Sequence, residues 1–270
     1  MSELQDNIRL AAEAISQASA LLITAGAGMG VDSGLPDFRG NSGFWRAYPA
    51  LKGYPFEEMA NPKWFVSDPT RAWGFYGHRL NLYRKTVPHA GFEILIKWSK
   101  HIPAFVYTSN VDGQFQKAGF SEDKIVECHG SIHHFQHLNT IKHGDEIWSA
   151  EGYNIDVDMS TVRAKAPLPK RDKQILRPNI LMFGDWGWCD DRTNEQYNNF
   201  EQWQNDTDMT HLVIVEMGAG TAIPSVRNLS RRFKEKGGTL IRINPRESHD
   251  ATIPLELGAK DALMAIDGEL

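Results

Sequence analysis

The chain has 270 residues, of which 41% are hydrophobic and 23% charged, as expected for a folded protein of one large domain or one domain with an inserted module. Its net charge of -5 lacks the basic surplus that attracts nucleic acid or an anionic membrane, so we expect neither as a partner. Residues 1–20 lack a signal-peptide pattern, and no apolar run is long enough to span a membrane. The 2 cysteines exclude a disulfide framework and make the cytoplasm the default location, while the oligomeric state stays unknown.

Apolar residues recur at helical spacing over 3–18, which predicts an amphipathic helix leading into the strand "ALLITAG" at 20–26. Further β-rich runs lie at 104–110, 124–130, 179–185, 211–218 and 239–245. Helical patterns lie at about 70–85, 89–100, 194–206, 222–236 and 256–266. The strands are too continuously apolar for a one-faced sheet, and they alternate with helices. This pattern predicts an α/β fold with a doubly wound, Rossmann-like parallel sheet that binds ligands at the carboxyl ends of its strands.

Two stretches break this alternation. The first strand is followed by about 60 residues dense in aromatics and turn formers, far more than an ordinary connection from strand to helix. Residues 131–177 are polar and rich in His, Lys and Asp. We interpret both as parts of a smaller module, formed by residues 39–88 and 131–177. The larger nucleotide-binding domain then comprises residues 1–38, 89–130 and 178–270, within one catalytic unit over 1–270.

A glycine-rich loop, "ITAGAGMGVDSGLPDFRG" at 23–40, follows the first strand. Gly26, Gly28 and Gly30 permit a tight turn and a close approach of phosphate to backbone N–H groups. A dehydrogenase fingerprint would have its third glycine at position 31, which is Val31, and an acid at the end of a second strand about 20 residues later. No such strand is predicted. The loop therefore favours nucleotide binding of another kind, with a plain tight turn as the alternative.

Further motifs follow in a fixed order. They are "TSNVD" at 108–112, "ECHGS" at 127–131, "RPNILMFGD" at 177–185, "GAG" at 218–220 and "INP" at 243–245. Together with the glycine loop, these segments resemble the motifs of the sirtuins, the NAD-dependent protein lysine deacylases. The matches run from residue 23 to about 260, and several motifs in the right order are far more specific than any single one.

The resemblance implies a reaction that cleaves the bond between nicotinamide and ribose in NAD. The acyl oxygen of a modified lysine, in a protein or peptide substrate, attacks the ribose carbon, and the products are nicotinamide, free lysine and O-acyl-ADP-ribose. A general base near neutrality is needed, and histidine suits that work. His129 is the catalytic base that the resemblance implies, with Asn110 orienting a water and the ribose, and Asp112 accepting hydrogen bonds from the nicotinamide carboxamide.

The resemblance also implies further contacts to NAD and to the substrate. Those to NAD come from Gly26, Ala27, Gly28, Asp37, Phe38, Arg39, Ser109, Asn110, Asp112, Gly218, Gly220 and Asn244. Phe38 would cover the ribose face and exclude water, and Asp37 and Arg39 would fix the loop and the cofactor. Substrate backbone would pair as a strand with Met182, Phe183 and Gly184. The alternative is structural: a core Phe38, a surface pair of Asp37 and Arg39, and turn or strand-end roles for the other residues.

The small module departs from the family pattern, because most sirtuins hold it with four zinc-bound cysteines in two pairs. Cys128 and Cys189 form no Cys-x-x-Cys pair, so we expect no metal and a module held by apolar packing. The alternative is a histidine site made of His133, His134, His137 and His143. His133 and His137 are four residues apart, which on a helix would put both on one face, and His134 and His143 lie nearby in the sequence.

Two other departures affect the cofactor site. Ser109 stands where the family commonly has Gln contacting the ribose, so one hydrogen bond is shortened or lost. Ala219 and Gly220 replace Thr and Ser near the adenosine ribose, which removes two hydroxyl groups and leaves backbone contacts.

The helix predicted at 72–85, "AWGFYGHRLNLYRK", carries Tyr76 and Arg79. This Tyr-x-x-Arg spacing is similar to that of sirtuins that remove succinyl, malonyl or glutaryl groups. A phenol and a guanidinium three residues apart lie on one helix face and can hold a terminal carboxylate. The alternative is an aromatic-rich packing helix with a solvent-facing arginine.

Two other functions remain open. Protein ADP-ribosyl transfer or NAD hydrolysis would use the same activated ribose with a different acceptor. A non-catalytic NAD-binding module is the other alternative, although the presence of His129 together with Asn110 and Asp112 argues against it.

Overall fold

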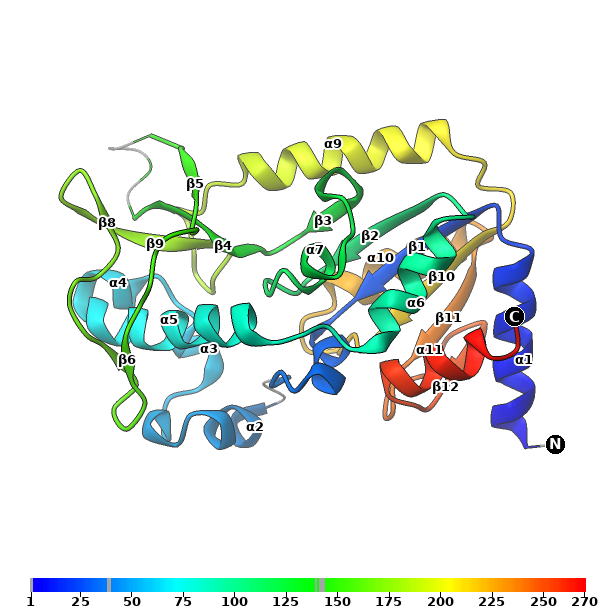
Figure 1. Ribbon diagram of the computed structural model, residues 1–270, viewed down its shortest axis with the longest axis horizontal. Helices are drawn as coiled ribbons and strands as arrows, with labels where there is room; N and C mark the ends of the chain where they lie inside the picture. Colours follow the sequence, from blue (N-terminus) through cyan, green and yellow to red (C-terminus); the bar gives the residue numbers. More distant parts are fainter. Residues whose placement is uncertain (1, 38–39, 139, 141–143) are drawn as a thin grey trace.

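A parallel sheet forms the larger part of the structure, a computed structural model that describes residues 2–37, 40–138, 140 and 144–270 (Figure 1). The six strands have the order β12-β11-β10-β1-β2-β3, and every neighbouring pair is parallel. They are β1 (Ala20–Ala25), β2 (Ala104–Thr108), β3 (Ile125–Glu127), β10 (Leu212–Met217), β11 (Thr239–Ile243) and β12 (Ile253–Leu255). The carboxyl ends of these strands therefore meet at one edge of the sheet.

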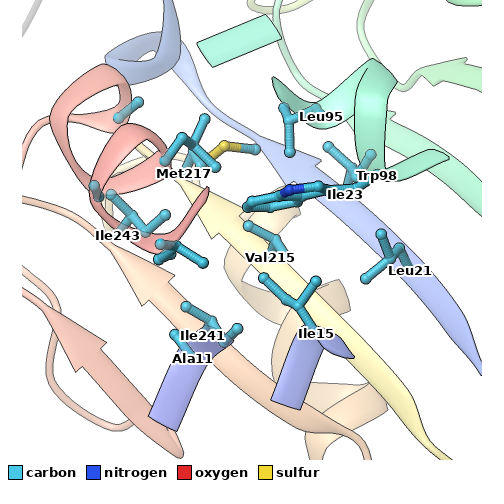
Figure 2. Packing of buried hydrophobic residues seen from close by; sticks show 14 of the residues in the cluster. Ala11, Ile15, Leu21, Ile23, Leu95, Trp98, Val215, Met217, Ile241 and Ile243 are labelled. Atoms are coloured by element: carbon cyan, nitrogen blue, oxygen red, sulfur yellow. The ribbon is translucent and has the colours of Figure 1, made fainter. Parts of the chain in front are cut away.

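Helices cover both faces of this sheet. They are α1 (Glu3–Ser16), α6 (Ala90–Ser99) and α11 (Ala259–Asp267) on one face, and α9 (Asp191–Asp206) and α10 (Ser225–Glu235) on the other. Alternate residues of β1 enter the two cores: Leu21 and Ile23 pack with α1 and α6 (Figure 2), while Leu22 packs toward α9 and α10. The prediction of a doubly wound α/β fold is thus confirmed. Within the described residues, no helix is both long and apolar enough to cross a bilayer.

A second, smaller body lies beside the parallel sheet and has its own sheet of order β5-β4-β9-β8 (Figure 1). Its strands are β4 (Gly130–His137), β5 (Ile147–Ser149), β8 (Lys170–Arg171) and β9 (Gln174–Ile180), with a separate hairpin of β6 (Val157–Asp158) and β7 (Arg163–Ala164). Its helices are α2 (Gly40–Ala47), α3 (Phe56–Met59), α4 (Lys63–Ser67) and α5 (Pro69–Lys85). Aromatic side chains such as Phe44, Tyr48 and Trp73 fill its core. The predicted boundaries of the small module stay a prediction.

Two predictions about local structure are wrong. The strand expected over 179–185 is shifted: β9 ends at Ile180 and pairs antiparallel with β4 in the small sheet, because the following residues turn around the Asp185 carboxylate. The helix considered over 133–137 is the strand β4, in which Ile132 and Phe135 enter the core. β12 was not predicted, and neither was the short helix α7 (Gln114–Ala118).

The histidines that were considered as metal ligands have other partners. His133 Nε2 lies 2.9 Å from the carbonyl oxygen of Asp112, and the His137 ring packs edge-on against Trp148. His143 lies outside the described residues. Among the residues that are described, no group of three or more His, Cys, Asp or Glu side chains is arranged to hold a metal ion. The absence of zinc remains a prediction.

A buried amide network joins the small sheet to the segment that follows β9. The Gln136 side chain is fully buried; its Nε2 donates to the carbonyl of Gly187 at 2.7 Å. Its Oε1 accepts from Asn179 Nδ2 at 3.0 Å and from the Cys189 N–H at 3.1 Å. Because the Gly187 carbonyl and the Cys189 N–H have Gln136 as their hydrogen-bond partner, this side chain fixes the path of residues 187–189 against β4 and β9.

We expect Gln136→Ala to lower the free energy of unfolding by about 2 kcal/mol, since it leaves the Cys189 N–H and the Gly187 carbonyl buried without their partner. Urea denaturation followed by circular dichroism measures this loss. Gln202→Ala, an exposed position on α9, is the control and should change stability by less than about 0.5 kcal/mol. Equal effects of the two substitutions would contradict the role of the network.

Candidate active site

Two glycine segments meet where β1 and β10 end. The Gly26 N–H donates to the carbonyl of Met217 at 2.9 Å, and the Gly28 N–H donates to the carbonyl of Gly218 at 3.0 Å. Gly218 has a φ of +59°, and a Cβ at this position would lie 2.4 Å from the Gly28 Cα. Only glycine permits so close a contact between two backbones. The predicted loop therefore lies at the carboxyl edge of the sheet, where open α/β sheets bind ligands, and continues as a short 3-10 helix, Ala27–Ser33.

The segment after β2 brings Asn110 to this loop. Asn110 Nδ2 donates to the carbonyl of Gly26 at 2.9 Å, and the Asn110 N–H donates to Thr108 Oγ1 at 3.0 Å. Ser109, which precedes it, donates its N–H to the carbonyl of Ala25 at 3.1 Å. Asn110 is thus a half-buried amide at the junction of the strand ends of β1 and β2.

Asp112 is a buried carboxyl group in the same segment. Its Oδ1 accepts the Gln114 N–H at 2.9 Å. Burial raises the pKa of Asp112 to about 6; the Gln114 hydrogen bond opposes this shift, and the charge of Glu127 adds to it. Asp112 also borders a hollow of about 320 Å³ together with Ser131 and His133. A carboxyl group that titrates so close to neutrality is typical of functional sites.

His129 lies between the two sheets, directly after β3. Its Nε2 is 3.2 Å from Ser225 Oγ at the start of α10. Burial lowers the pKa of the His129 imidazole, and a hydrogen bond with the Ser109 backbone works in the opposite direction. The ring therefore stays neutral at physiological pH, the state that a general base requires. Ser225 was not predicted as a site residue, because its contact with His129 joins positions 96 residues apart and leaves no local signal in the sequence.

The turn after His129 is closely packed. Gly130 has a φ of +76°, and a Cβ there would lie 2.2 Å from the carbonyl oxygen of Asn179 in β9. The Leu181 N–H, in turn, donates to the carbonyl of His129 at 2.9 Å. The backbone that follows His129 is therefore held by β9 and the segment after it, while the preceding residue, Cys128, donates its N–H to the Thr108 carbonyl at the end of β2.

The three residues predicted to bind substrate backbone lie in that following segment. Met182 is buried, and the Phe183 N–H donates to the carbonyl of Ala60 at 2.9 Å. The Met182 N–H donates to Asp185 Oδ2 at 3.2 Å. Gly184, which lies between Phe183 and Asp185, is exposed. The bond from Leu181 to His129 places this segment next to the catalytic candidate.

Tyr76 and Arg79 share one face of α5 and are both buried. Arg79 is 7% exposed; its Nε donates to Tyr83 OH at 2.9 Å, and its Cζ lies 5.6 Å from the centre of the Tyr76 ring. The alternative of a solvent-facing arginine is therefore wrong. Burial raises the pKa of Tyr76 to about 12, against the lowering effect of the Arg79 charge, and the Tyr76 hydroxyl has no hydrogen-bond partner among the described residues. Arg79 also lowers the pKa of Asp112 by its charge, which connects the two groups electrostatically.

The ends of β10 and β11 are joined by Asn244. Its Nδ2 donates to the carbonyl of Ala219 at 2.9 Å, and its Oδ1 accepts the N–H groups of Arg246 and Glu247, each at 3.1 Å. The Asn244 side chain is 1% exposed, so it organises the loops at the predicted adenosine end. Gly220 has open space where a Cβ would be, in keeping with a surface that can be approached closely.

Phe38 and Arg39 lie outside the described residues. Asp37 is half-buried, and Ala27 is exposed at the start of the 3-10 helix. The roles that the sequence assigns to these residues stay predictions.

The chain is similar in sequence to known proteins. The Sir2 family profile matches residues 26–222, which include the glycine loop, Asn110, His129 and Gly218. An NAD-dependent protein deacylase from Aquifex aeolicus is 29% identical over 231 residues, 84% of each chain. An NAD-dependent protein deacetylase from Saccharolobus solfataricus is 28% identical over 243 residues, 89% of this chain and 86% of the relative.

Solved structures agree in fold. A mutant of a Sir2 homologue in complex with ADP-ribose superimposes with a TM-score of 0.72 at 24% identity, over 96% of this chain and 94% of that one. A Sir2 homologue in complex with NAD gives a TM-score of 0.69 at 23% identity, over 96% and 92%. Since the family profile spans well over half of the chain, the protein belongs to the Sir2 family.

Proposed function

We propose that this protein is an NAD-dependent protein lysine deacylase that produces nicotinamide, free lysine and O-acyl-ADP-ribose. The observation that carries the proposal is the position of His129: a neutral imidazole with a lowered pKa, at the same sheet edge as Asn110 and the glycine loop. The relatives named as NAD-dependent deacylases or deacetylases support the same activity.

The residues present fit NAD. Asp112 offers a buried carboxylate, of which one oxygen accepts the Gln114 N–H, as an acceptor for a carboxamide. The close packing of Gly28 on Gly218 leaves a glycine-lined edge without bulky side chains for the phosphates, and Gly220 leaves space at the adenosine end. When bound, NAD supplies a ribose carbon activated by the departure of nicotinamide, to which the acyl oxygen of the modified lysine adds.

His129 and Asn110 then complete the reaction. We infer that His129 accepts the proton of a ribose hydroxyl at its Nε2, the nitrogen that lies beside Ser225 Oγ. Asn110 uses its side-chain oxygen to orient a water molecule and the ribose, while its Nδ2 stays bonded to the Gly26 carbonyl. Both side chains are half-buried at the strand ends, which limits the access of bulk water that would compete with the acyl oxygen.

We further propose that the acyl group carries a terminal carboxylate, as in succinyl, malonyl or glutaryl lysine. Arg79 supports this proposal, because a buried guanidinium pairs strongly with a carboxylate in a site of low dielectric. The buried hydroxyl of Tyr76, which has no hydrogen-bond partner among the described residues, offers a second donor. The proposed substrate is thus an acidic acyl-lysine in a protein, and the predicted cytoplasmic location stays a prediction.

Turnover of NAD with acetyl- and succinyl-lysine peptides tests the function. We expect nicotinamide, free lysine and O-acyl-ADP-ribose in equal amounts, and His129→Ala should lower kcat by at least about 100-fold because it removes the general base. His101→Ala, an exposed histidine away from the strand ends, is the matched control and should leave the rate unchanged. Nicotinamide released without deacylated peptide would instead indicate NAD hydrolysis or ADP-ribosyl transfer. Binding of NAD without any product would indicate a non-catalytic module.

Asp112→Asn should separate stability from activity. The raised pKa means that folding favours the protonated acid, so the stability that Asp112 contributes is complete below its unfolded pKa and is lost as pH rises through about 6. The asparagine variant should therefore melt at a higher temperature than the wild type at about pH 8, with a smaller difference at about pH 4. Its kcat/KM for NAD should fall at least about tenfold, because a charged acceptor is lost. A variant that is both less stable at high pH and fully active would contradict this role.

Arg79→Met should lower kcat/KM for succinyl peptides by about 30-fold or more relative to acetyl peptides, since the carboxylate loses a charge-assisted hydrogen bond. Because Arg79 is buried, its loss also affects stability, so Tyr76→Phe is the gentler second variant. It removes a hydroxyl without a described partner and should keep the melting temperature while lowering succinyl turnover alone. Equal effects on both acyl groups in both variants would reject the acidic-acyl assignment.

A further inference from the structure

Trp186 is displayed on the surface of the loop between β9 and α9. Its side chain is 99% exposed, whereas Trp188 in the same loop is half-buried and the remaining tryptophans lie in the cores or at their margins. Tryptophan buries more area than any other side chain on contact, so leaving it in water costs more than for other residues. An indole held fully in solvent beside a binding site is therefore a candidate contact for a ligand.

The backbone that carries Trp186 is held on both sides. Asp185 forms a fully buried ion pair with Arg177, and its Oδ1 accepts the Gly187 N–H at 3.1 Å. The Gly187 carbonyl accepts from Gln136 Nε2 at 2.7 Å. Trp186 thus lies between two residues that are bonded to the buried frame of the small sheet. A contact made by this indole would order only its own side chain and little backbone, which keeps the entropy cost of binding low.

Two more exposed apolar side chains border His129. Leu181, at the start of the same loop, is 39% exposed and bonds the His129 carbonyl through its N–H. Ile223, on the loop before α10, is 46% exposed, and Ser225 two residues later reaches His129 Nε2 at 3.2 Å. His129 is thus contacted at its carbonyl by the segment that carries Leu181 and at its ring by the segment that carries Ile223, and both segments expose an apolar side chain.

We propose that Trp186, together with Leu181 and Ile223, binds a bulky apolar side chain that flanks the acyl-lysine in the substrate. This inference rests on the proposed deacylase function. A lysine that delivers its acyl group to His129 must carry its neighbouring residues across the surface that borders His129. The charge of Asp185 beside the indole is already neutralised by Arg177, so the surface around Trp186 favours an apolar or aromatic neighbour over a charged one.

The test compares succinyl-lysine peptides that carry Phe, Ser or Arg on either side of the modified lysine. We expect the wild type to favour Phe over Ser by about tenfold in kcat/KM, mainly through KM, in line with the size of aromatic contacts. Trp186→Ala should remove this preference, and Trp186→Phe should restore most of it. Val66→Ala, an apolar side chain of α4 that is 74% exposed, is the control and should keep the wild-type preference.

A blocked succinyl-lysine without flanking residues separates the possible outcomes. It should be turned over equally by the wild type and Trp186→Ala, because the chemistry at His129 is untouched. If the wild type treats all flanks alike, or if Trp186→Ala keeps the Phe preference, the inference is wrong. A preference for Arg that depends on Trp186 would reject the apolar assignment in favour of a cation–π contact. If neither the succinyl-lysine peptides nor their acetyl-lysine counterparts are turned over, the proposed function fails, and the affinity of the same peptides for the wild type and Trp186→Ala, measured by calorimetry, still tests the role of Trp186.

Discussion

Contact between the backbones of Gly28 and Gly218 is the constraint on which the rest of the site depends. It fixes how closely the loops after β1 and β10 approach each other, and so where the carboxyl edge of the sheet opens. Asn110 is positioned by its bond to the Gly26 carbonyl in the same loop, and β3 pairs with β2 beyond it. A side chain at Gly218 would separate the strand ends and move the polar groups that surround them.

The small body depends on a different kind of interaction. Aromatic side chains of α2 and α5 form its core, and the Gln136 amide joins β4 and β9 to the loop that carries Trp186. The ion pair of Arg177 and Asp185 holds the same loop from the other side. Stability of this body and placement of the substrate surface are therefore properties of one buried polar network, since loss of a partner would leave uncompensated buried groups.

The parallel sheet could be predicted because its strands are buried on both faces and read as continuous apolar runs, such as Leu212–Met217. β12 was missed because Pro254 interrupts a run of only three residues. The strand β4 could not be separated from a helix, because the spacing of its histidines suits either structure until pairing with β9 is known. The position of β9 was misjudged because a local turn, in which the Asp185 carboxylate accepts the N–H groups of Met182 and Gly187, interrupts an apolar run that reads as a strand.

Within the site, the residues in recognised motifs, such as Asn110 and His129, lie together as expected at the strand ends. Ser225 could not be predicted, since its role depends on the approach of α10 to His129 across 96 residues of sequence. The burial of Arg79 could not be predicted either, because the sequence of a helix does not show which other elements cover its faces. Site residues in local motifs could thus be predicted from the sequence, whereas site residues whose environment depends on tertiary packing could not.

Gly130, the residue after the proposed base His129, lies at the boundary between the two bodies. Its left-handed backbone turns the chain from the parallel sheet into the antiparallel one directly after His129, with the carbonyl of Asn179 where a side chain would be. The proposed catalytic base, His129, therefore lies where the chain passes from one body to the other, and the orientation of its ring depends on how the two bodies are docked. His129 is bonded through its carbonyl to Leu181, next to the small sheet, and its ring lies against Ser225 of α10, so a change in how the two bodies are docked would strain one of these contacts and move the imidazole relative to residues 181–184.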